Sequence, residues 1–460
     1  MKHGLENRLS LFSQLKRDQK EAIGLLQIGT FLEYFDLMLY VHMAVLLNEL
    51  FFPKTDPHTA ALLSAFAFCS TYVLRPFGAL IFGHIGDTMG RKSTVITTTV
   101  MMAISCLMMS FLPTYAQIGI SAAWLVTICR IFQGLSSMGE IIGAEIYVTE
   151  MTKPPVQYPA VCLISVASSM GAVAALGVSS LIIKTGMSWR IAFLVGAVVA
   201  IVGSVARTRL RETPEFVDMK RKLYHERAKL KLDQKRDYVE ITKIKEQIKQ
   251  CGKETINKET IGAYIIVQCG WPLSFYLAYM YFNPLLKETY GYSAEDILYH
   301  NFLLSILLCV INTALGFLSY KIHPLKILKA RVTVFLMLVV LLPFLILFSA
   351  HSSHIFLLQS LLLIAAVGAH PADSVFLTHF PVLQRFTAAS FIYAVSRALI
   401  YVMTSFGLVY LTEWFGYYGL WAITLPVTVS FLWGLRHFEG LERKSGALPA
   451  LKPSSSLAAA

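Results

Sequence analysis

The sequence predicts an all-α polytopic membrane protein with about twelve transmembrane helices in two six-helix bundles. Its 460 residues are 55% hydrophobic and 15% charged, whereas soluble domains carry about 25% charged residues. Its apolar stretches are long enough to cross a bilayer, which takes about 20 helical residues. They fall into two groups of six on either side of one long polar stretch.

The apolar stretches define an N-terminal six-helix bundle over 22–208 and a C-terminal one over 260–435. A closed outer-membrane barrel is excluded, because its strands would be about ten residues long with alternating polarity. The expected spans are 22–50, 60–83, 94–112, 120–145, 158–183, 189–208, 260–286, 295–321, 332–350, 354–378, 388–412 and 416–435.

The distribution of basic residues predicts which parts of the chain face the cytoplasm. Most of the 40 Lys and Arg residues lie on the side of the polar stretch, and cytoplasmic loops are the ones that carry an excess of such residues. We therefore expect a cytoplasmic N-terminal segment (1–21), a cytoplasmic linker with a surface helix near 239–248 (209–259) and a cytoplasmic tail (436–460). The expected location is the bacterial cytoplasmic (inner) membrane.

A short charged turn, GHIGDTMGRK at 83–92, separates the second and third spans. Gly83 and Gly90 permit close backbone approach and a sharp turn, while Asp87 and Arg91 place opposite charges at the membrane edge. Such a turn can hold a moving helix in place, so these four residues are predicted gating residues. Glu140 and Glu145, towards the same end of the fourth span, are assigned to gating with them.

The turn closely resembles the signature that the major facilitator superfamily carries between its second and third helices. The first span (GTFLEYFDLMLY, 29–40), residues 74–79 (LRPFGA) and residues 130–134 (RIFQG) resemble the metabolite:proton symporter family. That family includes proline/betaine, α-ketoglutarate, citrate and shikimate transporters. The resemblance implies the major facilitator fold and proton-coupled transport by alternating access. The family usually repeats the turn in the second half, but residues 316–324 carry Tyr320 in place of the acid and His323 in place of a glycine.

Ionisable side chains within the first four spans are candidates for coupling, because a lone charge at the bilayer centre costs at least about 2.5–3.5 kcal/mol. Glu33 and Asp36 share a face of the first span, at a depth similar to that of Arg75 in the second. We predict that these three residues couple proton uptake to opening; the alternative is a permanent packing pair. Arg130 and Gln133 in the fourth span are candidates for substrate binding or coupling.

The second half supplies the other candidate substrate-binding residues. His370 and Asp373 in the tenth span and Arg397 in the eleventh could bind an anion or relay a proton. A buried ion pair with a bystander histidine is the alternative. Gln268, Tyr276 and Tyr279 of the seventh span could contact a substrate, although aromatic residues there also suit core packing or an interfacial belt.

These observations favour a secondary active transporter that imports a small carboxylate-bearing metabolite, either an organic acid or a zwitterion, together with protons. The alternatives are an exporter or antiporter of the same fold for a siderophore, metabolite or drug, and a membrane-embedded enzyme or sensor. We expect no enzymatic activity, no cofactor and no metal, with the proton gradient as the energy source. The expected partners are an anionic or zwitterionic solute, protons and the lipid bilayer; we expect no nucleic acid and a monomer.

Overall fold

The computed structural model describes residues 15–52, 57–232 and 256–448. The first half contains α2 (Arg17–Phe51), α3 (Pro57–Thr88), α4 (Arg91–Phe111), α5 (Tyr115–Ile118), α6 (Ile120–Met151), α7 (Gln157–Thr185) and α8 (Arg190–Arg207), and α9 (Pro214–Leu232) follows. The second half contains α11 (Lys258–Phe275), η1 (Tyr276–Tyr281), α12 (Phe282–Tyr290), α13 (Ala294–Lys321), α14 (Pro324–Leu347), α15 (Ser352–Ala365), α16 (Asp373–Thr378), α17 (Val382–Val402), η2 (Met403–Gly407), α18 (Leu408–Phe415), η3 (Gly416–Leu420) and α19 (Trp421–Lys444).

The described residues are predominantly helical, and the predicted fold class is confirmed. Nine helical segments among them are long and apolar enough to cross a membrane, and α8 and α15 contain two shorter apolar helices. Large apolar side chains cover the outside of the bundle, including Phe77, Trp124, Val202 and Phe348, which are 60%, 67%, 60% and 82% exposed. Such an exterior suits contact with lipid tails, which are as apolar as leucine.

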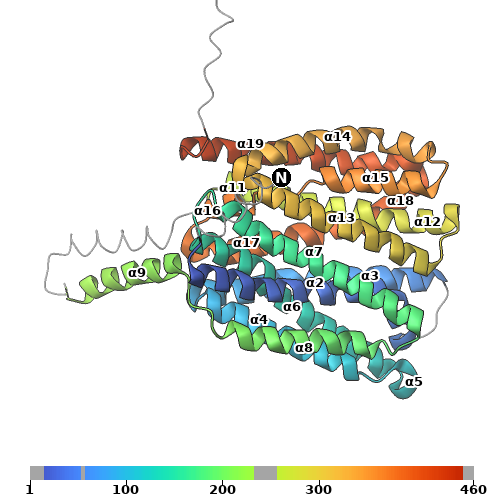
Figure 1. The fold of residues 1–460 in the computed structure, drawn as a ribbon, viewed down its shortest axis with the longest axis horizontal. Coiled ribbons are helices and arrows are strands. Elements are labelled where there is room, and N and C mark those ends of the chain that lie inside the picture. The colour runs from blue at the N-terminus through green and yellow to red at the C-terminus, as the bar shows by residue number, and fades with distance from the viewer. Residues whose placement is uncertain (1–14, 53–56, 233–255, 449–460) are drawn as a thin grey trace, which may run out of the picture.

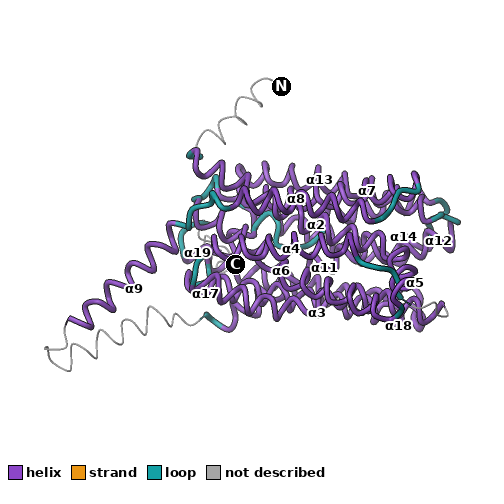
Figure 2. The backbone as a smooth tube through the Cα atoms, turned by 90° about the horizontal axis from the view of Figure 1, so that it is seen from below, coloured by secondary structure: helices purple, strands orange, loops and turns teal. Residues whose placement is uncertain are grey.

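The long helices run side by side along one axis of the molecule (Figures 1 and 2). In Figure 1 the first half occupies the lower part and the second half the upper part. The halves meet where α3 packs against α17 and where α7 packs against α13. Helix α9 projects beyond one end of the bundle (Figure 2), which is named the α9 end below.

Several element boundaries depart from the sequence prediction. Helix α3 continues to Thr88, so Gly83 and Asp87 lie in its last turns and the turn itself is reduced to residues 89–90. Helix α19 continues past the expected span end at 435 and reaches Lys444 in the expected tail. The expected linker helix near 239–248 lies outside the described residues, and the described part of the linker contains α9 instead.

The largest departure is in the tenth span, which was expected to be continuous over 354–378. Helix α15 ends at Ala365, and α16 begins only at Asp373. Gly368 and Pro371 lie in the interval, and both residues disfavour a continuous helix. Irregular backbone at membrane depth is tolerated where it is buried in protein or lines a cavity, and this stretch does line one.

Candidate functional site

A cavity of about 100 Å³ lies between the two halves. Its walls come from α2, α3, α6 and α7 of the first half and from α11, η1, α13, α14, α17 and residues 366–373 of the second. A single water molecule needs only about 10–15 Å³ on the same measure. The cavity therefore has room for several water molecules or for a small solute.

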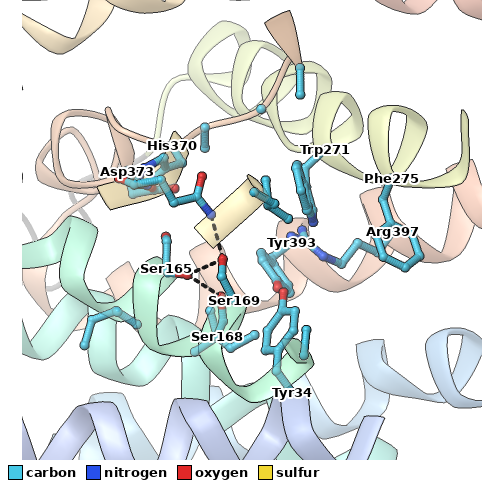
Figure 3. A pocket seen from close by; sticks show the side chains of 18 of the residues that line it. Tyr34, Ser165, Ser168, Ser169, Trp271, Phe275, His370, Asp373, Tyr393 and Arg397 are labelled. Atoms are coloured by element: carbon cyan, nitrogen blue, oxygen red, sulfur yellow. Dashed lines mark hydrogen bonds and ion pairs between the residues drawn. The ribbon is translucent and has the colours of Figure 1, made fainter. Parts of the chain in front are cut away.

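One wall of this cavity is aromatic. Trp271 of α11 lies close to Tyr393 of α17, and Phe275 of α11 also lines the cavity (Figure 3). Tyr72 of α3 and Tyr401 of α17 meet across the interface between the halves, with ring centroids 4.3 Å apart. This wall offers apolar faces, with electron-rich rings that attract cations.

The facing wall is rich in hydroxyl groups. Ser165, Ser168 and Ser169 of α7 line the cavity. The hydroxyls of Ser168 and Ser169 donate to the carbonyl oxygen of Ser165 at 2.7 and 3.0 Å. Asn312 of α13 donates from Nδ2 to Ser169 Oγ at 2.7 Å, so this hydrogen bond joins the two halves at the cavity wall.

Arg397 lies at the aromatic wall and is 6% exposed. Its guanidinium carbon is 3.3 Å from the centre of the Tyr393 ring, and Nη1 donates to Gln268 Oε1 at 3.3 Å. No described carboxylate lies within 4.0 Å of the guanidinium. A planar guanidinium fixed in this way presents a pre-oriented binding face for a carboxylate.

The second cavity arginine is already paired. Arg75 Nη2 of α3 lies 3.7 Å from Glu33 Oε1 of α2, and both side chains are buried. The Arg75 guanidinium also stacks on Tyr72, 4.7 Å from the ring centre. Arg75 belongs to the described lining of the cavity, whereas Glu33 does not.

Two carboxyl groups from opposite halves also line the cavity. Glu145 comes from α6, and Asp373 is the first residue of α16. Asp373 Oδ2 lies 3.8 Å from His370 Nδ1. The structure thus places Glu145 at the cavity, and not only near the turn with which the sequence grouped it.

The break in the tenth span is held by two side chains from neighbouring helices. Ser274 of α11 accepts from the Val367 amide at 3.0 Å and donates to the Val367 carbonyl at 3.2 Å. Arg331 of α14 donates to the carbonyl oxygens of Ile364 and His370, both at 3.1 Å. These bonds satisfy backbone groups that a continuous helix would have paired internally.

Asp36 and Arg130 form a separate buried cluster in the first half. Arg130 Nη1 lies 3.8 Å from Asp36 Oδ2 and donates to Gln133 Oε1 at 2.8 Å. Gln133 Nε2 donates to Asp36 Oδ1 at 3.0 Å. The Arg130 guanidinium lies 3.8 Å from the centre of the Tyr40 ring. Asp36 therefore pairs with Arg130, and Glu33 is the acid that pairs with Arg75.

The α9 end is closed by contacts between α3 and α17. Asp87 accepts hydrogen bonds from the backbone amides of Phe386 and Thr387 at 3.1 and 2.8 Å and from the Thr387 hydroxyl at 2.7 Å. The backbone of α3 at Gly83 also lies close to that of α17, because a Cβ added there would lie 2.7 Å from Thr387 Cα. The end of α3 is thus bonded directly to the start of α17.

Arg91 extends this closure to α6. Its guanidinium pairs with Glu150 at 2.9 Å, contacts Asp87 at 3.2 Å and donates to the Val382 carbonyl at 2.6 Å. Arg385 of α17 also pairs with Glu150, at 3.1 Å. We call the set Asp87, Arg91, Glu150, Arg385 and Thr387 the latch.

The turn beside the latch depends on Gly90. Its φ of 125° suits glycine. Glu212, just before α9, accepts from the amides of Arg91 and Lys92 at 3.0 and 3.3 Å. A carboxylate at this position also complements the positive end of the α4 dipole.

The matching turn of the second half makes a different set of contacts. His323 Nδ1 accepts from the Leu325 amide at the start of α14. His323 and His379 both face Glu442 of α19, with Nε2 to carboxylate distances of 3.5 and 2.8 Å. These residues tie three helices of the second half to one another.

The predicted substrate-binding residues divide between two places. Those that line the cavity are Gln268, Tyr279, His370, Asp373 and Arg397. Those that do not belong to its described lining are Arg130, Gln133 and Tyr276. The side chain of Glu140, a predicted gating residue, lies outside the described part of the chain.

Sequence reasoning missed several cavity residues. Arg331 lay one residue before an expected span, and its role depends on the break in the tenth span. That break had a signal in Gly368 and Pro371, inside a stretch expected to be one helix. The serines of α7 carry no such signal, because small polar residues are common at helix interfaces in membranes.

The comparisons with known proteins agree on the family. The sequence pattern of the Major Facilitator Superfamily matches residues 26–408. The inner membrane metabolite transport protein YhjE of Escherichia coli (strain K12) is 36% identical over 197 residues, which cover 41% of this chain and 45% of that protein. The proline/betaine transporter of the same strain is 33% identical over 204 residues, covering 43% of this chain and 41% of that protein. The chain thus matches less than half the length of these curated relatives.

Solved structures with the same fold cover nearly the whole chain. The proton:xylose symporter XylE bound to 6-bromo-6-deoxy-D-glucose aligns with a TM-score of 0.72 at 16% identity, over 92% of this chain and 98% of that one. The human organic anion transporter MFSD10 aligns with a TM-score of 0.62 at 16% identity, over 92% and 100%. At such identity the likeness concerns the fold alone. Together with the sequence match over residues 26–408, it shows that the chain belongs to the Major Facilitator Superfamily.

Proposed function

We propose that the protein is a secondary active transporter that imports a small carboxylate-bearing solute together with protons by alternating access. The matched relatives are named as metabolite and proline/betaine transport proteins, and none of those names describes an enzyme. The solute site is the cavity between the halves. The proposed location is the bacterial inner membrane with both termini in the cytoplasm.

The observation that carries the proposal is Arg397. A buried guanidinium without a described carboxylate partner is costly unless a ligand supplies the opposite charge. Tyr393 and Gln268 hold the group at the cavity wall, so little ordering is required when a carboxylate binds. A charge-assisted hydrogen bond of this kind contributes about 1.5–3 kcal/mol.

The cavity favours a zwitterion over a simple organic acid. Arg397 lies at the aromatic wall, where Trp271 and Tyr393 can also contact a cationic or apolar group. Glu145 and Asp373 line the same cavity and add negative charge. A solute with one carboxylate and one cationic nitrogen can match both signs.

Coupling to protons is assigned to the buried acid–arginine pairs of the first half. Glu33 pairs with Arg75 and Asp36 pairs with Arg130, at 3.7 and 3.8 Å. Protonation of either carboxylate would remove the attraction and free an arginine to move. Arg75 lines the cavity, so a change in the Glu33 pair reaches the solute directly.

The latch closes the end that we assign to the cytoplasm from the distribution of basic residues. In this state the solute enters from the opposite side, and release requires the latch to open. Asp87 and Arg91 then govern exchange between states without contacting the solute.

The test is uptake into proteoliposomes that contain the purified protein. Labelled proline, glycine betaine, α-ketoglutarate, citrate and shikimate are supplied singly, with and without an inwardly directed proton gradient. We expect gradient-dependent accumulation of at least one solute. Failure of every carboxylate and zwitterion to accumulate would refute the proposal.

Arg397 provides the sharper arm of this test. Arg397→Gln should raise the KM for the transported solute by at least about tenfold, because it removes the charge-assisted bonds. The KM of Arg397→Lys should lie between those of the wild type and Arg397→Gln, since lysine keeps the charge but lacks the planar guanidinium. Arg211→Gln is the matched control, because Arg211 is exposed and pairs with Asp18 at the surface. An unchanged KM in Arg397→Gln would show that the solute does not bind at Arg397.

A further inference from the structure

Two buried carboxyl groups, one from each half, line the cavity, and no described lysine or arginine lies within 4.0 Å of either. Glu145 of α6 is 5% exposed and Asp373 of α16 is 7% exposed. Helices α6 and α16 belong to opposite halves and pack against one another. Both side chains line the cavity, so water that enters it can reach both carboxyl groups.

The partners of these two groups are few. The side chain of Glu145 makes no hydrogen bond or ion pair with any described residue. Asp373 has the His370 ring nitrogen at 3.8 Å, which is too far for a hydrogen bond. His370 Nδ1 is itself buried and has no hydrogen-bond partner among the described residues.

The charged and titratable groups that surround this pair belong to the neighbouring helices. They are Glu33 of α2, Arg75 of α3, Cys162 of α7, Tyr264 of α11, Arg331 of α14 and Arg397 of α17.

Each nearby arginine is engaged elsewhere. Arg75 pairs with Glu33, and Arg331 donates to two backbone carbonyls. Arg397 stacks on Tyr393 and donates to Gln268. None of the three lies within 4.0 Å of a carboxylate oxygen of Glu145 or Asp373.

Two uncompensated carboxylates in such a place cannot both stay ionised. A buried charge without a partner costs several kcal/mol, and two like charges in one site raise that cost further, so one group takes a proton. We propose that Glu145 and Asp373 form a proton-binding site shared by the two halves. This inference rests on the proposed function, and it adds a site to the acid–arginine pairs discussed above.

The contrast with Glu33 and Asp36 is one of charge balance. Each of those acids has an arginine within 4.0 Å, so each can remain ionised in this state. Glu145 has none. In the state with the latch closed, the proton is therefore carried by Glu145 and Asp373.

The position of the pair connects it to the latch. Glu145 precedes Glu150 of the latch by five residues on α6, which is about 7.5 Å along the helix axis. Gly143, two residues before Glu145, lies close to Phe386 of α17, since an added Cβ would be 3.0 Å from that ring. Protonation of Glu145 or Asp373 thus changes the charge between the two halves next to the latch.

The proton step follows from this geometry. With the latch closed, a proton from water in the cavity adds to one carboxylate oxygen and forms an O–H bond, which lets the halves stay together. After the latch opens, the proton returns to water at the α9 end. Proton release and solute release then occur on the same side, as symport requires.

The decisive experiment uses Glu145→Gln and Asp373→Asn in the full-length protein. Both amides imitate the protonated carboxyl group. Gradient-driven accumulation of the panel solute that the wild type transports should be lost, while counterflow of labelled against unlabelled solute should persist. Glu439→Gln, which changes an exposed ion pair with Lys329, should behave as the wild type in both assays.

Two outcomes would overturn the inference. The first is accumulation at the wild-type level in both variants. The second is loss of counterflow as well as accumulation in variants that remain monodisperse, because the carboxyl groups would then serve binding or packing.

A measurement that needs no solute separates this inference from the proposed function. Infrared difference spectra of the reconstituted protein, taken across a pH titration, report the carbonyl band of a protonated carboxylic acid. We expect a band in the wild type that is weakened in both variants and kept in Glu439→Gln. A titrating band in a wild type that transports nothing would leave the site intact and refute the function. Proton-driven transport that neither variant changes would refute the proton-binding site and leave the proposed function intact.

Discussion

Arg207 is fully buried, and a glycine at position 29 makes room for it. The guanidinium crosses α2 at Gly29 and donates to the carbonyl oxygens of Leu25 and Leu26 at 3.1 and 2.9 Å and to the hydroxyl of Thr99. A Cβ at position 29 would overlap the guanidinium. One glycine thus permits an arginine to fasten α8 to α2 and α4.

We expect Gly29→Ala to destabilise the protein by about 1–3 kcal/mol, the range for over-packing a filled site. Thermal unfolding of the purified protein in detergent measures the effect. Gly24→Ala is the control on the same helix, because a Cβ there meets no described atom within 4 Å. Equal melting temperatures for the two variants would show that Arg207 can be displaced at little cost.

Asp87 serves the latch through its two carboxylate oxygens. Asp87→Asn replaces one acceptor oxygen by a donor, so one of the amide bonds from Phe386 or Thr387 is lost. We expect a lower transport turnover with little change in KM, since Asp87 does not line the cavity. Initial rates over a range of solute concentrations measure both quantities. Asp18→Asn, at an exposed ion pair with Arg211, is the control, and a raised KM at normal turnover would contradict the gating assignment.

The break between α15 and α16 is stabilised by side chains from two other helices, α11 and α14. Ser274 pairs both backbone groups of Val367, and Arg331 pairs two carbonyl groups beside it. Removing such a partner leaves buried polar groups unsatisfied, at about 1–3 kcal/mol.

Ser274→Ala should therefore lower the unfolding midpoint and weaken solute binding together, because residues 366–370 form part of the cavity wall. Ser360→Ala is the matched control, since its hydroxyl donates only to the Phe356 carbonyl one turn earlier in the same helix. Calorimetry and a binding titration with the transported solute measure the two effects. A Ser274 variant as stable as the control would mean that water replaces the hydroxyl.

Elements differ in how well the sequence predicted them. Continuous helices such as α13 and α14 follow from long apolar stretches, because a lipid environment forces the backbone to pair with itself. The interruption of the tenth span could not be derived in the same way. It is stabilised by Ser274 and Arg331, about 90 and 35 residues away, and their positions follow only from helix packing.

The residues of the candidate site, too, could be predicted only in part from the sequence. Buried charges identified Arg75, Asp373 and Arg397 as candidates, because their presence in apolar stretches needs an explanation, whereas Glu145 was assigned to gating with the charged turn. Their partners could not be predicted, since depth along a helix does not fix the face. Asp36 accordingly pairs with Arg130 and does not reach the cavity.

On the scale of the whole molecule, the closure of one end depends on few charges. Glu150 lies at the centre of the latch and pairs with Arg91 of the first half and Arg385 of the second. Buried pairs of this kind are strongly destabilised when one partner is removed. Loss of Arg385 should therefore shift the protein towards a state that is open at the α9 end.

Cys162 offers a natural reporter for that shift. It is 1% exposed, and its Sγ lies against Pro371 and Ser319 of the other half. In a protein that retains Cys162 as its single cysteine, Arg385→Gln should accelerate maleimide labelling. The control retains Cys106, which is buried within the first half beside Asp36 and should not respond. Unchanged labelling of Cys162 would indicate that the latch does not hold the halves together.

The cluster of His323, His379 and Glu442 has a consequence for how the molecule can deform. It joins the start of α14, the end of α16 and the last turns of α19 through one carboxylate. Three helix ends that are joined through one carboxylate should move together as a rigid unit. Spin labels placed on these three ends should keep their mutual distances through a transport cycle, while each distance to α3 changes.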